Sequence, residues 1–175
     1  EKRKDLSKII KKECVSYKIV AVEPREIDER VDKQITLNEL EVMKMAQILN
    51  ELKPEAIFID AADVDEERFA KRIKKLLNYV PRRFIARHKA DDIYPIVGAA
   101  SILAKNRRDQ VIEELKEKYG EIGSGYPSDE KTINFLQDFL KTYRKIPKCA
   151  RITWKTTKKL IDLELHNRKI TEFFK

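Results

Sequence analysis

Hydrophobic residues recur every three or four positions along much of the chain, which is the period of an amphipathic helix. This pattern predicts helices over residues 4–13, 66–78, 94–119, 129–143 and 153–166, and a helical turn over 26–31. On the first helix the expected buried positions are Leu6, Ile9 and Ile10.

A further helix is predicted to begin after Thr36, because Glu39 follows three residues later at the spacing of a capping box. We expect its apolar face to comprise Leu40, Met43, Met45, Ala46, Ile48 and Leu49. Methionine adapts to irregular gaps, so both methionines are expected to fill the core. Asp65 and Asp129 are expected to cap the helices that follow them.

Three short runs rich in apolar or β-branched residues, at 14–22, 56–60 and 83–87, predict strands. Strands alternating with helices predict an α/β layered domain, with a central sheet of parallel strands flanked by helices. We expect one domain over residues 1–128, with 129–166 as its helical C-terminal extension and 167–175 as a tail.

Composition adds a strong basic balance to this picture. The 175 residues include 38 basic and 30 acidic side chains, for a formal charge of +8, which favours a polyanionic partner. Cys14 and Cys149 lie far apart and indicate neither a disulfide framework nor a zinc site. No apolar stretch approaches the ~20 residues of a membrane span. We therefore expect a cytoplasmic protein without a membrane partner.

Two carboxylates follow consecutive predicted strands. Asp60 ends the strand at 56–60, and Asp91 follows the strand at 83–87. Ligands bind at the carboxyl ends of strands in open α/β sheets, and paired carboxylates suit Mg²⁺ or Mn²⁺. Such metal ions activate water in phosphodiester hydrolysis. The alternative is that Asp60 caps the following loop and Asp91 caps a helix, and the residues alone leave both open.

Two further segments carry features of nucleic-acid binding. Three of the four glycines lie within 120–125, directly before Tyr126, which could either stack on a sugar or base or fold onto the core. From Lys141 to Lys159 there are eight basic residues and no acidic one, with Tyr143 and Trp154 between them. This run favours a surface that follows phosphates, and the alternative is a solvated helix face.

Several motifs together resemble archaeal ribonuclease HII, the type 2 ribonuclease H, from about residue 20 to the end of the chain. They are EPREIDER at 23–30, LNELE at 37–41, IDAADVD at 59–65, HKADDIYPIVGAASILAK at 88–105, GSGYPSD at 123–129 and RITWKT at 151–156. The resemblance implies a ribonuclease H-like fold. It also implies a metal-dependent endonuclease of DNA replication and repair, which cuts the RNA strand of RNA–DNA hybrids and at ribonucleotides embedded in duplex DNA, leaving 5′-phosphates.

The resemblance also implies roles for particular residues. Asp60 and Asp91 match the third and fourth catalytic, metal-binding aspartates of the family, and Tyr126 matches the tyrosine that stacks on the sugar at the RNA–DNA junction. Residues in matching substrate-binding motifs are Lys105, Arg151, Trp154 and Lys155.

This sequence departs from the family pattern at its start. The family opens with an Asp-Glu-Ala-Gly-Arg-Gly strand that supplies two more metal-binding acids, and an Asp-Ser-Lys segment follows it. Neither occurs here. We therefore expect the first strands of the fold to be missing from this chain, and the sequence leaves open whether it is active alone.

The tail ends with Ile170, Phe173 and Phe174, spaced as in a sliding-clamp-binding box, although Asn167 stands where glutamine is usual. Two alternatives remain: a tail that is mobile or extended and binds the clamp, or phenylalanines that fold back onto the last helix. We expect a monomer. The rival to the enzyme is a non-catalytic basic α/β domain that binds nucleic acid or a protein.

Overall fold

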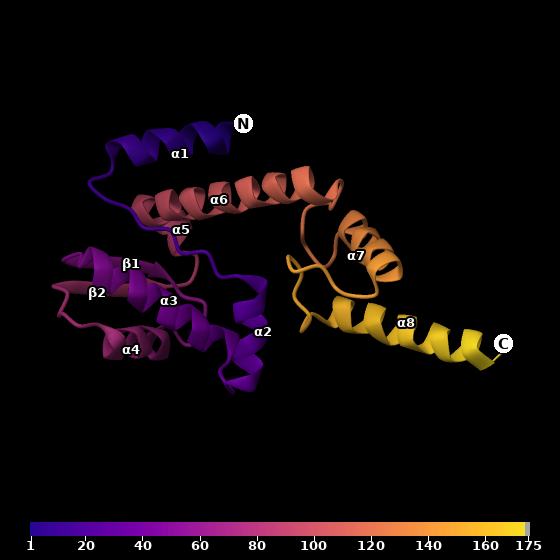
Figure 1. Ribbon diagram of the computed structural model, residues 1–175. Coiled ribbons are helices and arrows are strands. Elements are labelled where there is room, and N and C mark those ends of the chain that lie inside the picture. The colour runs from indigo at the N-terminus through magenta and orange to yellow at the C-terminus, as the bar shows by residue number, and fades with distance from the viewer. Residues whose placement is uncertain (174–175) are drawn as a thin grey trace. The chain divides into compact units, whose positions relative to one another are not determined.

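The computed structural model describes the backbone of residues 1–173 and the side chains of residues 1–166 (Figure 1). In chain order the elements are α1 (Lys2–Glu13), α2 (Pro24–Asp32), α3 (Leu37–Leu52), β1 (Ala56–Asp60), α4 (Glu66–Leu76), β2 (Arg83–Arg87), α5 (Ala90–Ile93), α6 (Pro95–Tyr119), α7 (Glu130–Tyr143) and α8 (Lys155–Phe173). Within this described part, no helix combines the length and apolar character that a membrane crossing requires.

The chain forms two compact units. The first comprises Glu1–Ala21 and Lys33–Asp109, and the second comprises Val22–Asp32 and Gln110–Lys175. The helix α6 contributes to both units, because the division falls between Asp109 and Gln110. The boundary expected at residue 128, between the domain and its helical extension, lies within the second of these units.

The first unit contains a small parallel sheet. β1 and β2 pair in parallel, with Ala56 opposite Arg83 and Asp60 opposite Arg87, which confirms the two predicted strands and their orientation. The strand predicted over 14–22 is wrong, since residues 16–23 have no regular structure. A strand needs a neighbour for its backbone hydrogen bonds, and the sheet in the described residues contains β1 and β2 alone.

One face of this sheet carries the core of the first unit. Ile57 and Ile59 of β1 pack there with Val42 and Ala46 of α3 and with Phe69 and Ile73 of α4. Met45 packs against this cluster as expected. The expectation for Met43 is wrong, because Val42 takes the inward position and the Met43 side chain is 51% exposed.

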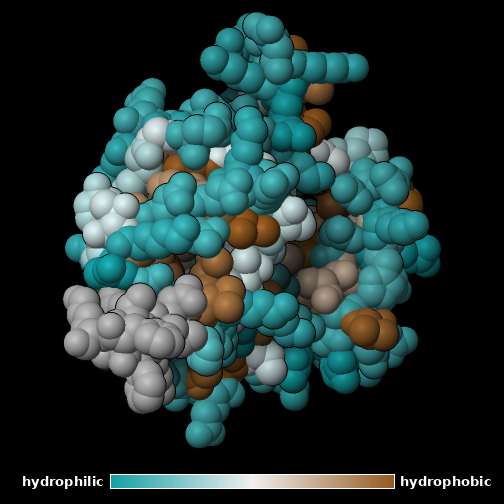
Figure 2. Space-filling view, turned by 90° about the vertical axis from the view of Figure 1, so that its right-hand side faces the viewer, coloured by the Kyte–Doolittle hydropathy of each residue, from teal (hydrophilic) through white to brown (hydrophobic). Residues whose placement is uncertain are grey.

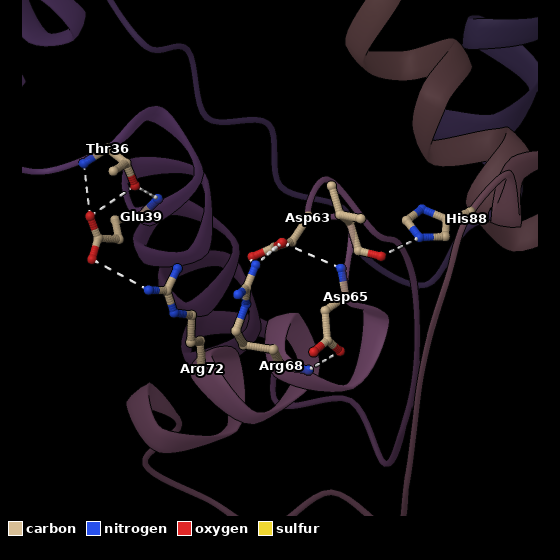
Figure 3. Close-up of polar contacts among 8 residues, drawn as sticks. Thr36, Glu39, Asp63, Asp65, Arg68, Arg72 and His88 are labelled. Atoms are coloured by element: carbon tan, nitrogen blue, oxygen red, sulfur yellow. Dashed lines mark hydrogen bonds and ion pairs between the residues drawn. The ribbon is translucent and has the colours of Figure 1, made fainter.

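The predicted helix starts are confirmed by their hydrogen bonds. Thr36 Oγ1 accepts a hydrogen bond from Glu39 N at 3.2 Å, and the Glu39 carboxylate accepts one from Thr36 N at 2.8 Å (Figure 3). This completes the capping box of α3. Asp65 caps α4 and Asp129 caps α7. These caps are local interactions, and their spacing along the chain is therefore sufficient to identify them.

The apolar face expected for α1 is partly wrong. Ser7 is the buried residue of this helix, whereas Leu6 and Ile9 are exposed. Arg3 forms an ion pair with Asp109 of α6. A small serine at the buried position and a charged contact near the start of α1 replace the apolar stripe that periodicity suggested.

In the second unit α7 packs against α8, with Leu136 and Leu140 of α7 buried. The helix α8 runs to Phe173, beyond the predicted end at residue 166, so an extended tail is wrong for its backbone. The side chains of Ile170 and Phe173, and all of Phe174, lie outside the described residues.

Candidate functional site

Asp60 lies on the sheet face opposite the core of the first unit. Side chains alternate along a strand, so Asp60 shares its face with Phe58. The Phe58 ring packs against that of Tyr94 with centroids 4.8 Å apart. The exposed Asp60 side chain accepts a hydrogen bond at Oδ1 from the backbone N–H of Ala90, at 3.2 Å. The carboxylate is thereby held against the first residue of α5.

Asp91 is the next residue of this short helix and is partly exposed. The N-cap of α5 is Lys89, whose backbone is left-handed with φ 53°, and Asp91 lies within the first turn. Its alternative role as a helix cap is therefore wrong. Asp60 does act on a helix start, because it accepts the Ala90 N–H. The structure thus brings Asp60 to the residue preceding Asp91.

Gly98, near the start of α6, lies close to the backbone of Asp91 in α5. A Cβ at Gly98 would lie 3.2 Å from the backbone oxygen of Asp91, which is tighter than ordinary van der Waals contact. The small residue therefore lets the start of α6 lie against the segment that carries Asp91.

Glu66 and His88 hold the turn between β2 and α5. His88 N donates to Glu66 Oε1 at 2.6 Å, and His88 Nε2 lies 3.2 Å from the carbonyl oxygen of Val64. Figure 3 shows the imidazole pointing at this oxygen. The contacts connect the segment before Asp91 to the loop after Asp60. Sequence reasoning missed Glu66, whose only signal was an acidic side chain in the first turn of a helix.

Asp63 fixes the loop that follows Asp60. Its side chain is 4% exposed, and it forms a two-pronged pair with the Arg68 guanidinium while Asp65 N donates to Oδ1 at 3.4 Å (Figure 3). The Arg68 hydrogen bonds, aided by the Asp65 N–H, outweigh burial and lower the pKa of Asp63. The carboxylate therefore stays ionised and holds the loop at neutral pH. Asp63 belongs to the IDAADVD motif, but its spacing in the sequence did not predict this role.

The described residues hold no group of three or more His, Cys, Asp or Glu side chains placed to bind a metal ion. Asp60 and Asp91 fit Mg²⁺ or Mn²⁺ by chemistry, since both ions prefer carboxylate oxygens. Two carboxylates supply only part of the coordination that such an ion takes, so further oxygen ligands are needed.

In the second unit the glycine-rich turn presents Tyr126. Gly123 and Gly125 have φ of 71° and 74°, a conformation that favours glycine. Thr132 Oγ1 accepts from Gly125 N at 3.0 Å and donates to Ile122 O at 2.9 Å. The Tyr126 side chain is 53% exposed, so the alternative in which it folds onto the core is wrong.

Asp129 supports the same turn. Its Oδ2 accepts from Ser124 N at 2.6 Å and its Oδ1 from Lys131 N at 3.1 Å. Hydrogen bonds from the Ser124 side chain and backbone, with smaller contributions from Lys131 and Thr132, lower the pKa of Asp129 to about 2. The carboxylate is thus ionised throughout the neutral range.

The segment 150–156 carries three of the predicted substrate-binding residues. The Arg151 guanidinium lies over the Trp154 ring, 5.4 Å from its centroid. Trp154 is partly buried and also lines a cavity of about 70 Å³ together with Gly125. Lys155 is exposed at the first turn of α8. Thr156 Oγ1 donates to Pro127 O at 3.4 Å, which joins this segment to the Tyr126 turn.

Asp28 of α2 holds this segment from the other side. Its carboxylate accepts hydrogen bonds from Ile152 N at 2.8 Å, Thr153 N at 3.0 Å and Thr153 Oγ1 at 2.5 Å. The partners lie 124 and 125 positions away in sequence. No local pattern pointed to this contact.

The basic run from Lys141 to Lys159 takes part in an ion pair within the folded chain. Arg144 forms an ion pair with Glu164 of α8, an acidic partner that lies beyond the run in sequence. The exposed basic residues of the run are Lys141, Arg144, Lys145, Lys148, Lys155, Lys158 and Lys159, whereas Arg151 is partly buried. In the first unit, Lys105 is exposed on α6. The face drawn in Figure 2 is mainly hydrophilic, with hydrophobic residues between the hydrophilic ones.

Comparison with solved structures identifies the class. The crystal structure of ribonuclease H2 from Pyrococcus horikoshii OT3 matches with a TM-score of 0.86 and 45% identity, covering 92% of this chain and 75% of that chain. A ribonuclease HII in complex with PCNA, from Archaeoglobus fulgidus, matches with a TM-score of 0.81 and 40% identity, over 91% of this chain and 75% of that chain. The domain is thus a ribonuclease H-type α/β enzyme.

The family follows from the sequence itself. The model of the family described as Ribonuclease HII matches residues 1–157. The Ribonuclease HII of Pyrococcus furiosus is 48% identical, over 99% of this chain and 78% of its own length, and that of Thermococcus kodakarensis is 48% identical, over 89% and 68%. The chain belongs to the ribonuclease HII family of endoribonucleases.

These comparisons confirm the resemblance, the fold class and the enzymatic function expected from the motifs. The family match begins at residue 1, so the resemblance extends further toward the N-terminus than the motifs indicated. The rival interpretation, a non-catalytic binding domain, is not favoured.

Proposed function

We propose that Asp60 and Asp91 supply two of the carboxylates that hold Mg²⁺ or Mn²⁺ at the active site of this endoribonuclease. The observation that carries the proposal is the hydrogen bond from Ala90 N to Asp60, which brings the end of β1 to the turn carrying Asp91. Divalent metal held there would activate a water molecule and stabilise the leaving oxygen of a phosphodiester. The substrate is an RNA–DNA hybrid or a DNA duplex with embedded ribonucleotides, and the product carries a 5′-phosphate.

The second unit supplies the duplex contacts in this proposal. Tyr126 is exposed on a turn braced by Asp129 and stacks on a sugar of the substrate. Arg151 and Lys155 contact phosphates, with Trp154 supporting the Arg151 guanidinium. From the first unit, exposed Lys105 adds a further phosphate contact.

The catalytic proposal is tested on a duplex that contains a single ribonucleotide, with Mg²⁺ or Mn²⁺ present. The assay uses the chain as it stands and the chain joined at its N-terminus to a strand carrying Asp-Glu-Ala-Gly-Arg-Gly, the motif that the family pattern calls for. Asp91→Asn should abolish cleavage in the active form while duplex affinity stays within about twofold, because one neutralised ligand removes metal binding rather than phosphate contacts.

Asp92→Asn is the matched control. Asp92 is the exposed neighbour of Asp91 in α5, and its substitution removes the same charge. It should retain cleavage. Full activity of Asp91→Asn, or equal loss in both variants, would remove Asp91 from the catalytic set.

The basic segment has its own test. Replacing Lys145, Lys148 and Lys155 together by glutamine should weaken duplex binding similarly for all sequences and flatten the dependence of affinity on salt, because phosphate contacts release counterions. Lys71, Lys74 and Lys75 of α4 provide a control triple substitution with the same charge change. If the salt slope is unchanged in the first variant, or changes equally in both, the basic run is a solvated surface without phosphate contacts.

The tail is proposed to bind a DNA sliding clamp. The proposal is supported by the related ribonuclease HII of Archaeoglobus fulgidus, which was solved in complex with PCNA. In this chain the contact residues are Ile170, Phe173 and Phe174, at the C-terminal end of the sequence. The enzyme is further proposed to act as a cytoplasmic monomer apart from the clamp.

Replacing Phe173 and Phe174 together by alanine should abolish clamp binding, measured by surface plasmon resonance, and leave the melting temperature unchanged. Glu164, which lies earlier on α8 and forms an ion pair with Arg144, provides a control. Glu164→Gln should lower the melting temperature and leave the clamp affinity unchanged. A marked drop in melting temperature with unchanged clamp affinity would show that the two phenylalanines belong to the core.

A further inference from the structure

We propose that Asp28 is a positioning residue for duplex binding, whose carboxylate holds the segment that carries Arg151 and Trp154. The inference rests on the proposed function of that segment. Asp28 itself is assigned no contact with substrate or metal. It acts through Ile152 and Thr153, the two residues that lie between Arg151 and Trp154.

Both carboxylate oxygens of Asp28 are engaged. Oδ2 accepts from Ile152 N at 2.8 Å, while Oδ1 accepts from Thr153 N at 3.0 Å and from Thr153 Oγ1 at 2.5 Å. Three donors from two consecutive residues converge on one carboxylate, as at a helix N-cap, although the carboxylate comes from a distant helix. Hydrogen bonds to an ionised acceptor are about twice as strong as neutral ones, so this contact restricts the backbone firmly.

The helix that carries Asp28 is anchored in the same unit. Its neighbour Ile27 is buried, and Pro24 begins α2 with a backbone angle suited to a first helical turn. The carboxylate is therefore presented from a fixed element. Residues 144–154 contain turns and bends but no helix or strand. The Asp28 carboxylate therefore gives this irregular stretch a fixed point of attachment.

The far end of the same segment is held independently. Thr156 Oγ1 donates to Pro127 O, and Trp154 shares a cavity wall with Gly125. The segment is thus attached to the Tyr126 turn through Thr156 and to Asp28 through Ile152 and Thr153. Arg151 extends from beside the Asp28 attachment, with its guanidinium over the Trp154 ring. Loss of Asp28 releases the backbone next to Arg151 and leaves two N–H groups to water.

This arrangement makes a prediction opposite to simple electrostatics. Removing a negative charge from a protein that binds a polyanion should tighten binding. If Asp28 positions Arg151, Asp28→Asn should instead weaken duplex affinity, by about tenfold, since it breaks charge-assisted hydrogen bonds. It should also lower the salt slope by about one, as loss of one phosphate contact does, although Asp28 carries no positive charge.

The experiment measures duplex binding by fluorescence anisotropy at several salt concentrations, on the full chain, well below the melting temperature. The variants are Asp28→Asn, Arg151→Ala and the double variant, with Asp32→Asn as a control that removes the same charge at the exposed end of α2. The losses of affinity in Asp28→Asn and Arg151→Ala should not add in the double variant, because both substitutions remove the same phosphate contact of Arg151. Asp32→Asn should bind as the wild type does or more tightly.

Thr153→Val provides a milder probe, because it deletes one hydroxyl bond to Asp28 and keeps both backbone bonds. It should weaken binding by less than Asp28→Asn while keeping the fold. If Arg151→Ala weakens binding but Asp28→Asn binds as tightly as the wild type, the positioning role is refuted and the proposed function stands. If Arg151→Ala itself has no effect, the proposed role of that segment in duplex binding fails.

Discussion

Gly123 is the position where a single methyl group should disturb the turn that presents Tyr126. Its φ of 71° lies in the left-handed region, where an alanine costs roughly 1–2 kcal/mol. A Cβ there would lie 2.6 Å from Asp129 Oδ2, 2.7 Å from Thr132 Oγ1 and 2.8 Å from Thr132 N. None of these atoms is the free end of a flexible side chain, since each belongs to the hydrogen-bonded brace of the turn.

Gly120 offers a matched control. It has a φ of 81°, but a Cβ there meets nothing within 4 Å. Gly120→Ala should therefore cost the conformational term alone, about 1–2 kcal/mol. Gly123→Ala adds overpacking, typically about 1–3 kcal/mol, for a total of about 2–5 kcal/mol. In a chain of this length each kcal/mol lowers the melting temperature by about 2–4 °C.

The assay is thermal and urea unfolding followed by fluorescence of Trp154, the single tryptophan of the chain. Trp154 lies in the same unit as Gly120 and Gly123, so its fluorescence reports the unfolding of the unit that contains both substitutions. Duplex binding should also weaken more for Gly123→Ala than for Gly120→Ala, because the turn carries Tyr126. Equal destabilisation by the two substitutions would refute the steric argument, and no loss in either would refute the left-handed strain as well.

Three further predictions concern stability. Phe69 is fully buried, so Phe69→Ala should lower the free energy of unfolding by about 3–5 kcal/mol in a denaturant titration, while Val64→Ala at an exposed position should not change it. Thr36→Ala removes the capping hydrogen bond of α3 and should cost about 1 kcal/mol in the same titration; no change would contradict the cap. The pKa of Asp129 is lowered to about 2, so its contribution to stability is present above the ordinary value of ~3.9 and is lost as pH falls through 2. Asp129→Asn should flatten the melting temperature across that window, and an unchanged acid profile would contradict its role.

Local and periodic features of the sequence determined much of the fold. The capping box at Thr36 and the caps at Asp65 and Asp129 were predictable, because a cap joins residues only two or three positions apart. The two short apolar runs with a helix between them predicted parallel strands, and this placed Asp60 at the carboxyl end of one of them. The motifs around Asp91 and Tyr126 also sufficed to indicate the family.

Tertiary structure decided what depends on partners distant in sequence. The run at 14–22 has β propensity but forms no strand in the described chain, because a strand is defined by its neighbour. Helical period identifies a stripe but does not choose between adjacent positions, which is why Val42 is buried where Met43 was expected. The contact of Asp28 with Thr153 spans 125 positions, and no spacing rule encodes such a hydrogen bond. It exists only because folding brings α2 against that segment of the second unit.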